Sequence, residues 1–340
     1  MPSTRARSRV SWPGPAPTSR GCAVHGLGTA LPDRVISSSS VAERLGLKEE
    51  WIVQRLGVRR RHVLAEGERL SDLAALAGRR ALADAALEPA ELDLVVAASG
   101  SQDELIPNMA PLVAEGVGAA GVGAFDVGAA CSGFITGLSV GAAQIEAGRA
   151  EAVLVIGADA LSHHTDPDDR RTAPLFADGA GAVVLRPDED VRIGPARLWT
   201  DTVGVDLVHM HRDTQVIYME GLETYRHAVA SLTDATRSIL ETTGLEIADI
   251  DLFVYHQANA RILGAVADRL GLEERQRVSC IAETGNTSAA SIPLALASVA
   301  AEGRLHPGSR VLLGAIGGGF IWGTCLLEWA GRGEDGKNAP

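Results

Sequence analysis

The sequence has 340 residues, 46% of them hydrophobic, which provides enough apolar material for a large buried core in one domain or two. Aromatic residues make up only 4% and glycine is abundant, so helices packed closely on sheets are favoured, and we expect an α/β protein. The formal net charge of -12 disfavours nucleic acid and anionic membrane as main partners, because such polyanions repel a negative protein.

The termini and the cysteines indicate where the protein works. Residues 1–20 are basic and proline-rich without an apolar run, so we predict a disordered tail rather than a signal peptide, and a second tail at residues 333–340. No apolar stretch is long enough to span a bilayer. The cysteines lie far apart, which favours a reducing compartment and a cytoplasmic location: Cys22, Cys131, Cys280 and Cys325.

The first half of the chain alternates apolar strand patterns with helical ones. Serine caps followed by helical spacing predict helices at residues 37–46 and 71–87, and a Gly/Ala-rich stretch predicts one at residues 131–147. Short apolar runs predict buried strands at residues 23–28, 94–98, 124–127, 152–157 and 181–186. Because strands and helices alternate, we expect these strands to be parallel.

The second half repeats this order loosely. Helical spacing predicts helices at residues 222–242, 258–270 and 291–301, and apolar runs predict strands at residues 252–255, 311–315 and 322–329. The segments AVLVIGAD and VLLGAIGGG occupy similar places after a long helix. This similarity favours two related halves, residues 21–190 with the nucleophile and residues 191–332 with the histidine and asparagine described next.

Cys131 is the candidate nucleophile. It lies in DVGAACSGF, directly after a predicted strand, so we expect its sulfur to face the positive end of the next helix. Such a site lowers the pKa of a thiol and makes it a nucleophile toward thioesters, with the Cys131 N–H as one oxyanion donor. Considered alone, an isolated cysteine is more often a small buried apolar residue.

His256 and Asn286 are candidate hydrogen-bond donors. His256 ends the apolar run DLFVYH, at the edge where α/β sheets form their ligand clefts. Asn286 lies in ETGNTSAASIP, and by itself it is more typical of a turn. The functional interpretation gains weight because Cys131, His256 and Asn286 each stand at a predicted strand-to-helix junction, where a doubly wound sheet exposes side chains.

Five motifs together resemble, in order and spacing, the ketoacyl-acyl-carrier-protein synthase III family of thiolase-like enzymes: DVGAACSGF, FADGAGAVVL, HQAN, ETGNTSAASIP and GGGFIWG. The resemblance covers residues 23–329. It implies a duplicated five-layer α/β/α/β/α fold, a homodimer, and an enzyme that needs neither a metal nor an organic cofactor.

The resemblance implies a role for each candidate residue. Cys131 receives an acyl group from acyl-CoA, and His256 with Asn286 binds the thioester carbonyl of malonyl-acyl carrier protein. Decarboxylation of the malonyl group leaves a carbanion that persists only as an enolate, and each donor aimed at its oxygen is worth roughly 3 kcal/mol. The N–H near Gly318 completes the oxyanion hole for the acyl group, as the resemblance implies.

The resemblance also implies contacts for the substrates. Trp51 and Arg55 in WIVQRLG line the coenzyme A entrance, and Arg170 in DPDDRRT stacks on adenine. Asn259 in HQAN lines the pantetheine tunnel, and Arg261 is a candidate contact for an acidic carrier protein. The basic run at residues 59–61 fits a solvated turn equally well.

Several alternatives stay open at this point. GAIGGGFIWG has no second cysteine, which argues against a thiolase, whereas Glu104 leaves open an enzyme that needs a glutamate acid near the thiol. The loop SQDELIPNM and the short segment 198–225 depart from the family pattern and leave the acyl group undetermined. They permit a polyketide-priming role, or an acyltransferase that forms an ester or amide without condensation. HHTDPDD lacks the spacing of a metal site, so we predict no metal.

Overall fold

The computed structural model describes residues 20–331. The tail predicted at residues 333–340 lies outside the described residues, as does all but the last residue of the tail predicted at 1–20.

The first sheet has five strands in the order β1-β7-β6-β4-β5. They are β1 (Gly21–Ala30), β7 (Asp178–Asp188), β6 (Val153–Ala160), β4 (Leu94–Ala98) and β5 (Gly123–Val127). β4 is parallel to both β5 and β6, as predicted, but β7 is antiparallel to both β1 and β6. The prediction of parallel strands is therefore wrong for β1 and β7. No α-helix follows β6 before β7, so the chain returns without the helical crossover that a parallel pair requires.

The second sheet has four strands in the order β11-β12-β13-β8. They are β11 (Leu252–Tyr255), β12 (Arg310–Gly317), β13 (Ile321–Glu328) and β8 (Ile193–Thr200). β11 and β12 are parallel, whereas β12 with β13 and β13 with β8 are antiparallel. The predicted boundary between residues 190 and 191 falls in the loop before β8. The division into two duplicated domains at this loop stays a prediction.

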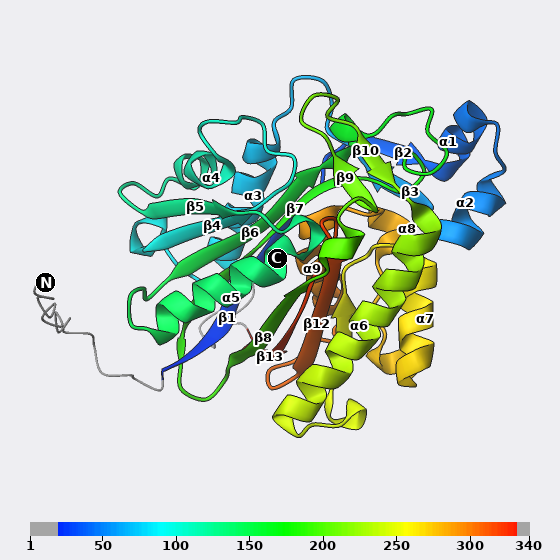
Figure 1. The fold of residues 1–340 in the computed structure, drawn as a ribbon. Helices are drawn as coiled ribbons and strands as arrows, with labels where there is room; N and C mark the ends of the chain where they lie inside the picture. Colours follow the sequence, from blue (N-terminus) through cyan, green and yellow to red (C-terminus); the bar gives the residue numbers. More distant parts are fainter. Residues whose placement is uncertain (1–19, 332–340) are drawn as a thin grey trace, which may run out of the picture.

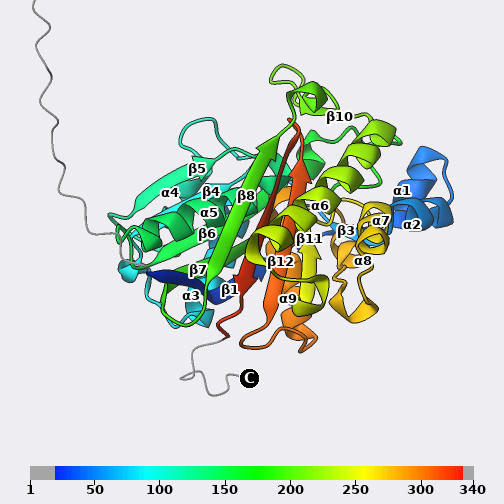
Figure 2. The same cartoon turned by 60° about the horizontal axis from the view of Figure 1, so that its bottom comes forward.

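Helices cover both sheets and fill the space between them (Figure 1). α3 (Leu70–Asp84) and α4 (Met109–Val117) pack on the first sheet, and α5 (Gly133–Glu146) and α9 (Ser291–Ala301) contact both sheets. α6 (Gly221–Thr243) lies along the outer face of the second sheet, as Figure 2 shows, and packs against α7 (Ala260–Leu270). This is the predicted five-layer α/β/α/β/α arrangement.

The remaining elements are short. They are α1 (Ser38–Leu45), α2 (Glu49–Leu56), α8 (Ile281–Thr284), β2 (Val35–Ser37), β3 (Arg60–His62), β9 (Val208–Met210), β10 (Ile217–Met219), and the 3₁₀ turns η2 (Ala130–Ser132) and η7 (Ser288–Ala290) among others. Of these, only α1 was predicted from the sequence.

Two glycines allow the helices and turns between the two sheets to pack closely against the first sheet. A Cβ atom at Gly137 in α5 would lie 2.9 Å from the Val155 side chain of β6. A Cβ atom at Gly157 in β6 would lie 2.3 Å from the carbonyl oxygen of Ala289 in η7. Only glycine permits this second approach, because no rearrangement of side chains relieves a clash with backbone. Gly157 therefore brings a turn of the second half against a strand of the first.

Candidate active site

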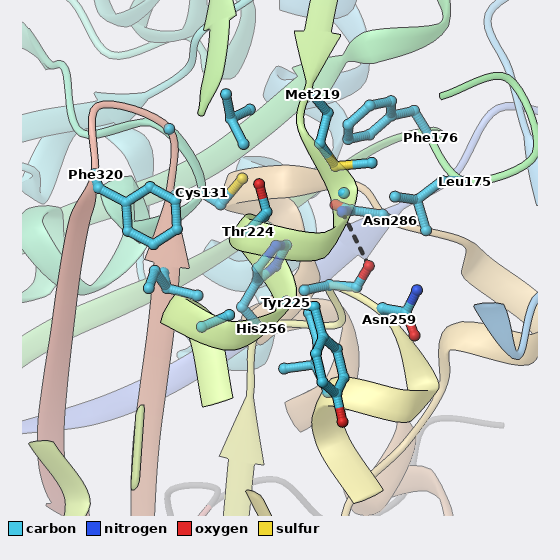
Figure 3. A pocket seen from close by; sticks show the side chains of 18 residues that line it. Cys131, Leu175, Phe176, Met219, Thr224, Tyr225, His256, Asn259, Asn286 and Phe320 are labelled. Carbon is cyan, nitrogen blue, oxygen red and sulfur yellow. Dashed lines mark hydrogen bonds between the residues drawn. The ribbon is translucent and has the colours of Figure 1, made fainter. Parts of the chain in front are cut away.

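One cavity of about 80 Å³ brings the three candidate residues together. Cys131, His256 and Asn286 all line it, and Figure 3 shows their side chains around the same space. Asn259 and Gly318 also line this cavity. The other walls are mainly apolar and include Leu175, Phe176, Val208, Met219, Thr224, Tyr225, Ile316 and Phe320.

Cys131 stands on a tight turn between β5 and α5. The preceding residue, Ala130, has φ = +44°, a left-handed conformation that costs an L-residue about 1–2 kcal/mol. Gly317, at the end of β12, lies directly against this turn, because a Cβ atom there would come within 2.6 Å of the Cys131 backbone nitrogen. The turn therefore fixes the cysteine between the first sheet and the glycine-rich end of the second.

Burial dominates the electrostatics of Cys131. It raises the pKa of the thiol to about 11, although a hydrogen bond from the Ser288 hydroxyl, at 3.3 Å from Sγ, acts in the opposite direction. The nearby Asp159 carboxylate raises this pKa further. The predicted lowering of the thiol pKa is therefore wrong, because removing the sulfur from water outweighs the local hydrogen bonds. At neutral pH the free protein carries a thiol here.

His256 is a neutral hydrogen-bond donor. It follows β11 directly, is 2% exposed, and burial lowers the pKa of its imidazole to about 3. Its Nδ1 lies 2.6 Å from the Ser291 Oγ, which also accepts the Gln257 N–H at 3.3 Å. This contact holds the imidazole ring in place, and the imidazole hydrogen lies on Nε2 when the Ser291 hydroxyl donates its own hydrogen to Nδ1.

Asn286 has a fixed amide orientation. Its Oδ1 accepts the Ser288 N–H at 3.0 Å, and its Nδ2 donates to the carbonyl oxygen of Ala258 at 3.3 Å, the dashed line in Figure 3. Its backbone N–H donates to the Leu175 carbonyl, and its own carbonyl accepts from Ala177. Because Oδ1 is held by a donor, the second Nδ2 hydrogen is the group that a ligand can use.

Asn259 and Gly318 line the cavity for different local reasons. Asn259 is the N-cap of α7, and its Oδ1 accepts the Arg261 N–H at 2.8 Å. Gly318 lies between β12 and β13, and a Cβ atom there would approach the Val208 carbonyl to 2.7 Å. The β9 strand is therefore held close over the glycine turn. The roles that the resemblance implies for Asn259 and Gly318 stay predictions.

The other predicted substrate contacts do not line this cavity. Trp51 and Arg55 belong to α2, where the Arg55 guanidinium lies 5.4 Å from the centroid of the Trp51 ring. Arg170 donates from Nε to the Leu45 carbonyl at the end of α1, at 3.1 Å. α1 packs on α2 and α2 on α7, so these three side chains lie outside the cavity, toward the edge that α1, α2 and α7 form.

Arg261 connects this edge to the cavity. It is exposed at the start of α7, and its guanidinium lies 5.5 Å from the ring centroid of Tyr225, which lines the cavity. The roles predicted for Arg261, and for Trp51, Arg55 and Arg170, stay predictions.

Two residues next to Cys131 were missed from the sequence. Ser288 lies inside the motif ETGNTSAASIP, and Asp159 is the single charged residue of the buried strand β6. An acidic residue that interrupts an otherwise apolar strand was the available signal. Met219 and Thr224 were missed because they come from β10 and α6, in or beside the weakly patterned segment 198–225.

Within residues 20–331, no cluster of three or more His, Cys, Asp or Glu side chains is arranged to hold a metal ion. In the same part of the chain, none of the helices is both long and apolar enough to cross a membrane.

The five layers, with a cysteine, a histidine and an asparagine around one cavity, define the class of thiolase-like enzymes. Two family models match the chain: 3-oxoacyl-[acyl-carrier-protein] synthase III over residues 125–202, and the C-terminal part of the same family over residues 240–329. The β-ketoacyl-[acyl-carrier-protein] synthase III 3 of Streptomyces coelicolor is 43% identical, over 91% of this chain and 98% of its own.

Solved structures agree with these matches. The crystal structure of 3-oxoacyl-[acyl-carrier-protein] synthase III from Aquifex aeolicus is similar with a TM-score of 0.89 and 38% identity, over 91% of this chain and 100% of that one. The priming β-ketosynthase of the R1128 polyketide pathway has a TM-score of 0.88 and 35% identity, over 93% and 98%. The chain belongs to the 3-oxoacyl-[acyl-carrier-protein] synthase III family, which confirms the resemblance stated from the motifs.

Proposed function

We propose that this protein is a 3-oxoacyl-acyl-carrier-protein synthase III that transfers an acyl group from acyl-CoA to Cys131 and condenses it with malonyl-acyl carrier protein. The observation that carries the proposal is the shared cavity, where the thiol of Cys131, a neutral His256 and an orientated Asn286 surround one space. This arrangement joins a nucleophile to two neutral donors, which is what a decarboxylating condensation requires.

In the first step, the Cys131 sulfur attacks the carbonyl carbon of the acyl thioester, and coenzyme A leaves as a thiol. The developing oxyanion accepts hydrogen bonds from the backbone N–H groups of Cys131 and Gly318. The close contact of Gly317 with the Cys131 backbone supports this pairing, because it holds the two segments of chain together.

In the second step, the malonyl thioester oxygen accepts hydrogen bonds from His256 Nε2 and Asn286 Nδ2. Carbon dioxide departs, and the enolate carbon attacks the acyl-Cys131 thioester to form the new carbon–carbon bond. The bond between the acyl carbon and the Cys131 sulfur breaks, and Cys131 leaves as a thiolate that keeps both electrons of that bond. A neutral imidazole suits this step, since the hydrogen that stabilises the enolate stays on Nε2.

We assign the substrate contacts to the rim of the cavity. Trp51, Arg55 and Arg170 are proposed to hold coenzyme A, Asn259 the pantetheine arm, and Arg261 the acidic carrier protein. The exposure of Arg261 beside a residue that lines the cavity supports its role in docking a carrier at the entrance.

We also propose a cytoplasmic homodimer. Support for the dimer comes from β5, an edge strand of the first sheet whose Phe125 side chain is 40% exposed. An edge strand with an exposed aromatic residue is a surface that a second copy can cover.

The test is to incubate the purified protein with a panel of acyl-CoAs and malonyl-acyl carrier protein. We expect the mass of one acyl group on Cys131, release of carbon dioxide, and a 3-ketoacyl product on the carrier. Acyl loading without carbon dioxide release would reject condensation and favour the alternative, transfer to a hydroxyl or amine acceptor. The acyl mass that accumulates identifies the preferred donor.

A further inference from the structure

A second cavity, which the mechanism above does not use, shares Phe176 with the first, and Figure 3 shows this side chain among those of the first cavity. Its volume is about 230 Å³. Its walls are mainly apolar and include Ile36, Val41, Val63, Pro167 and Ala173. Ser40 and Arg44, on the exposed side of α1, also line it, so it is open to solvent. Because an apolar cavity of about 150 Å³ can hold benzene, the second cavity has room for a small organic molecule.

Arg61 is a buried cation in the wall of this cavity. The residue is 2% exposed, and its Nη2 donates to the Ser38 Oγ at 2.7 Å. Its Nε and Nη1 are buried and have no hydrogen-bond partner among the described residues. In the same part of the chain, no carboxylate forms an ion pair with this guanidinium. Since a buried charge without a partner costs free energy, this position calls for a counter-charge.

Arg61 keeps its charge at neutral pH. Burial lowers the pKa of its guanidinium to about 10, which is still well above 7. The other arginine of the cavity, Arg44, is already balanced, because its Nε and Nη2 donate to the two carboxylate oxygens of Asp168 at 2.8 and 3.2 Å. The hydroxyl groups of the cavity also donate to oxygen atoms of the protein: Ser40, Ser162 and Thr165. The buried donors of this wall that have no acceptor therefore belong to Arg61.

A purely structural role for Arg61 does not account for its charge. The hydrogen bond to Ser38 joins β3 to the start of α1, but it occupies only one of the guanidinium nitrogens. A neutral apolar side chain of similar volume would fill the same space without a buried charge, and such replacements are often neutral or stabilising. The planar N–H groups of a guanidinium match a carboxylate well. The unpaired charge therefore points to an anion that binds from the cavity.

We propose that the second cavity binds a small organic carboxylate, with the carboxylate against Arg61 and the apolar part against Phe176 and the aliphatic walls. Burial of this apolar part adds to the affinity, so the walls favour an organic anion over inorganic phosphate. The exposed Ser40 and Arg44 mark the side from which the ligand enters. This inference goes beyond the proposed function and does not rest on it.

The experiment measures binding of butanoate, a carboxylate similar in size to benzene, by isothermal titration calorimetry and by the melting temperature of the purified protein. Butanamide is the neutral analogue of the same shape, and inorganic phosphate is the anion without an apolar part. All three are compared at pH 7 and equal ionic strength. We expect wild type to bind butanoate at millimolar concentrations and to melt at a higher temperature with it, because a ligand of the native state stabilises that state. Butanamide and phosphate should cause no comparable shift.

Arg61→Met tests the contact directly, since it removes the charge and keeps an unbranched apolar side chain. Ser38 keeps a partner in this variant, because its hydroxyl donates to the Val58 carbonyl at 2.7 Å. We expect the affinity for butanoate to fall at least about tenfold, the typical contribution of a hydrogen bond to a charged group. If Arg61 were purely structural, the affinity for butanoate would be unchanged.

Arg44→Met is the matched control. It removes the other arginine of the cavity, whose charge Asp168 already balances, so the affinity for butanoate should stay within about twofold of wild type. If Arg61→Met does not fold, Val41→Phe decides. The larger side chain fills the cavity from α1 and should abolish butanoate binding while Arg61 stays in place.

Three results would overturn the proposal. Butanoate binding that persists in the folded Arg61→Met or Val41→Phe protein would place the ligand elsewhere, for example in the first cavity. Equal binding of butanamide would remove the role of charge, and absence of butanoate binding by wild type would remove the site. Tighter binding of phosphate than of butanoate would overturn the assignment to an organic carboxylate. Because none of these measurements uses acyl-CoA or a carrier protein, their outcome is separate from that of the proposed function.

Discussion

Two parts of the site are built in different ways: the floor of the cavity, which Cys131, His256 and Asn286 form, and the rim, where Arg55 and Arg261 lie. On the floor, Asn286 has both side-chain polar atoms and both backbone polar groups in hydrogen bonds, and His256 is 2% exposed with its Nδ1 hydrogen-bonded to the Ser291 Oγ. On the rim, Arg55 and Arg261 are exposed and each lies over one aromatic ring. The groups that we propose to react are thus held before a substrate arrives, whereas the groups that we propose to bind it are free to adapt to a ligand.

The strongest test of the floor is Cys131→Ala, because it removes the nucleophile itself. We expect complete loss of acyl loading, measured as the absence of any acyl mass on the intact protein after incubation with acyl-CoA. Wild-type protein under the same conditions is the positive control. An unchanged acyl mass in the variant would assign the nucleophile to another residue.

Removing either donor should separate the two steps. Asn286→Ala and His256→Ala each delete one hydrogen bond to the enolate oxygen, worth about 3 kcal/mol, so decarboxylation of malonyl-acyl carrier protein should fall about 100-fold or more. Acyl loading should continue in both variants, as seen by mass spectrometry, while release of carbon dioxide reports the second step. Equal loss of both steps would contradict the division of roles.

Gly317→Ala tests whether the floor tolerates displacement. The added Cβ would lie 2.6 Å from the Cys131 backbone nitrogen, so the nucleophile turn must shift. We expect acyl loading to fall about 10-fold to 100-fold, since a displacement near 1 Å costs that much in rate. Gly148→Ala is the control, because a Cβ atom added at this glycine would have no heavy atom within 4 Å. Its φ of +65° means that some loss of stability is expected in this variant too. Comparable loss of activity in both variants would argue against a specific steric effect.

On the rim, Arg261→Glu should change binding rather than chemistry. Charge reversal on an exposed side chain should raise the KM for malonyl-acyl carrier protein several-fold, more at low salt than at high salt, and leave kcat nearly unchanged. The KM for acyl-CoA in the loading step is the internal control. A fall in kcat with an unchanged KM would place Arg261 in the chemical step instead.

The smallest expected effect concerns the pH dependence of decarboxylation. Burial lowers the pKa of His256 to about 3, so this imidazole stays neutral from pH 8 down to pH 5 and does not titrate in that range. Decarboxylation should therefore show no step near pH 6.5 that His256→Gln removes. Rates of carbon dioxide release measured across this range in both proteins check the point. A step that disappears in the variant would show a charged imidazole.

Periodicity explains what the sequence could predict of the fold. The buried strands β4, β6 and β12 are continuous apolar runs, and α6 keeps a helical stripe over its whole length, so both kinds of element were predicted near their observed bounds. β8 was missed because only its first residue is buried and the rest are partly or fully exposed, which leaves no clear apolar pattern. Strand direction at β7 depends on the missing crossover helix, which local patterns do not encode.

The candidate site was predictable in its members but not in its electrostatics. Cys131, His256 and Asn286 were predicted from short motifs, and the structure brings these three side chains to one cavity, while their roles stay predictions. The pKa of the thiol was predicted in the wrong direction, because desolvation depends on which parts of the chain cover the sulfur. The bridge from Ser288 to Cys131 likewise joins residues that are distant in the sequence, so only the folded chain reveals it.

The approach of Ala289 to Gly157 has a consequence for how this enzyme becomes active. The contact joins a turn late in the chain to a strand formed much earlier, and the serine beside it reaches the nucleophile. Such long-range contacts form late in folding, after extensive loop closure. A partially folded chain with an intact first sheet would therefore hold Cys131 without the side chains of His256 and Asn286 beside it, so the cavity that joins the three residues exists only in the complete fold.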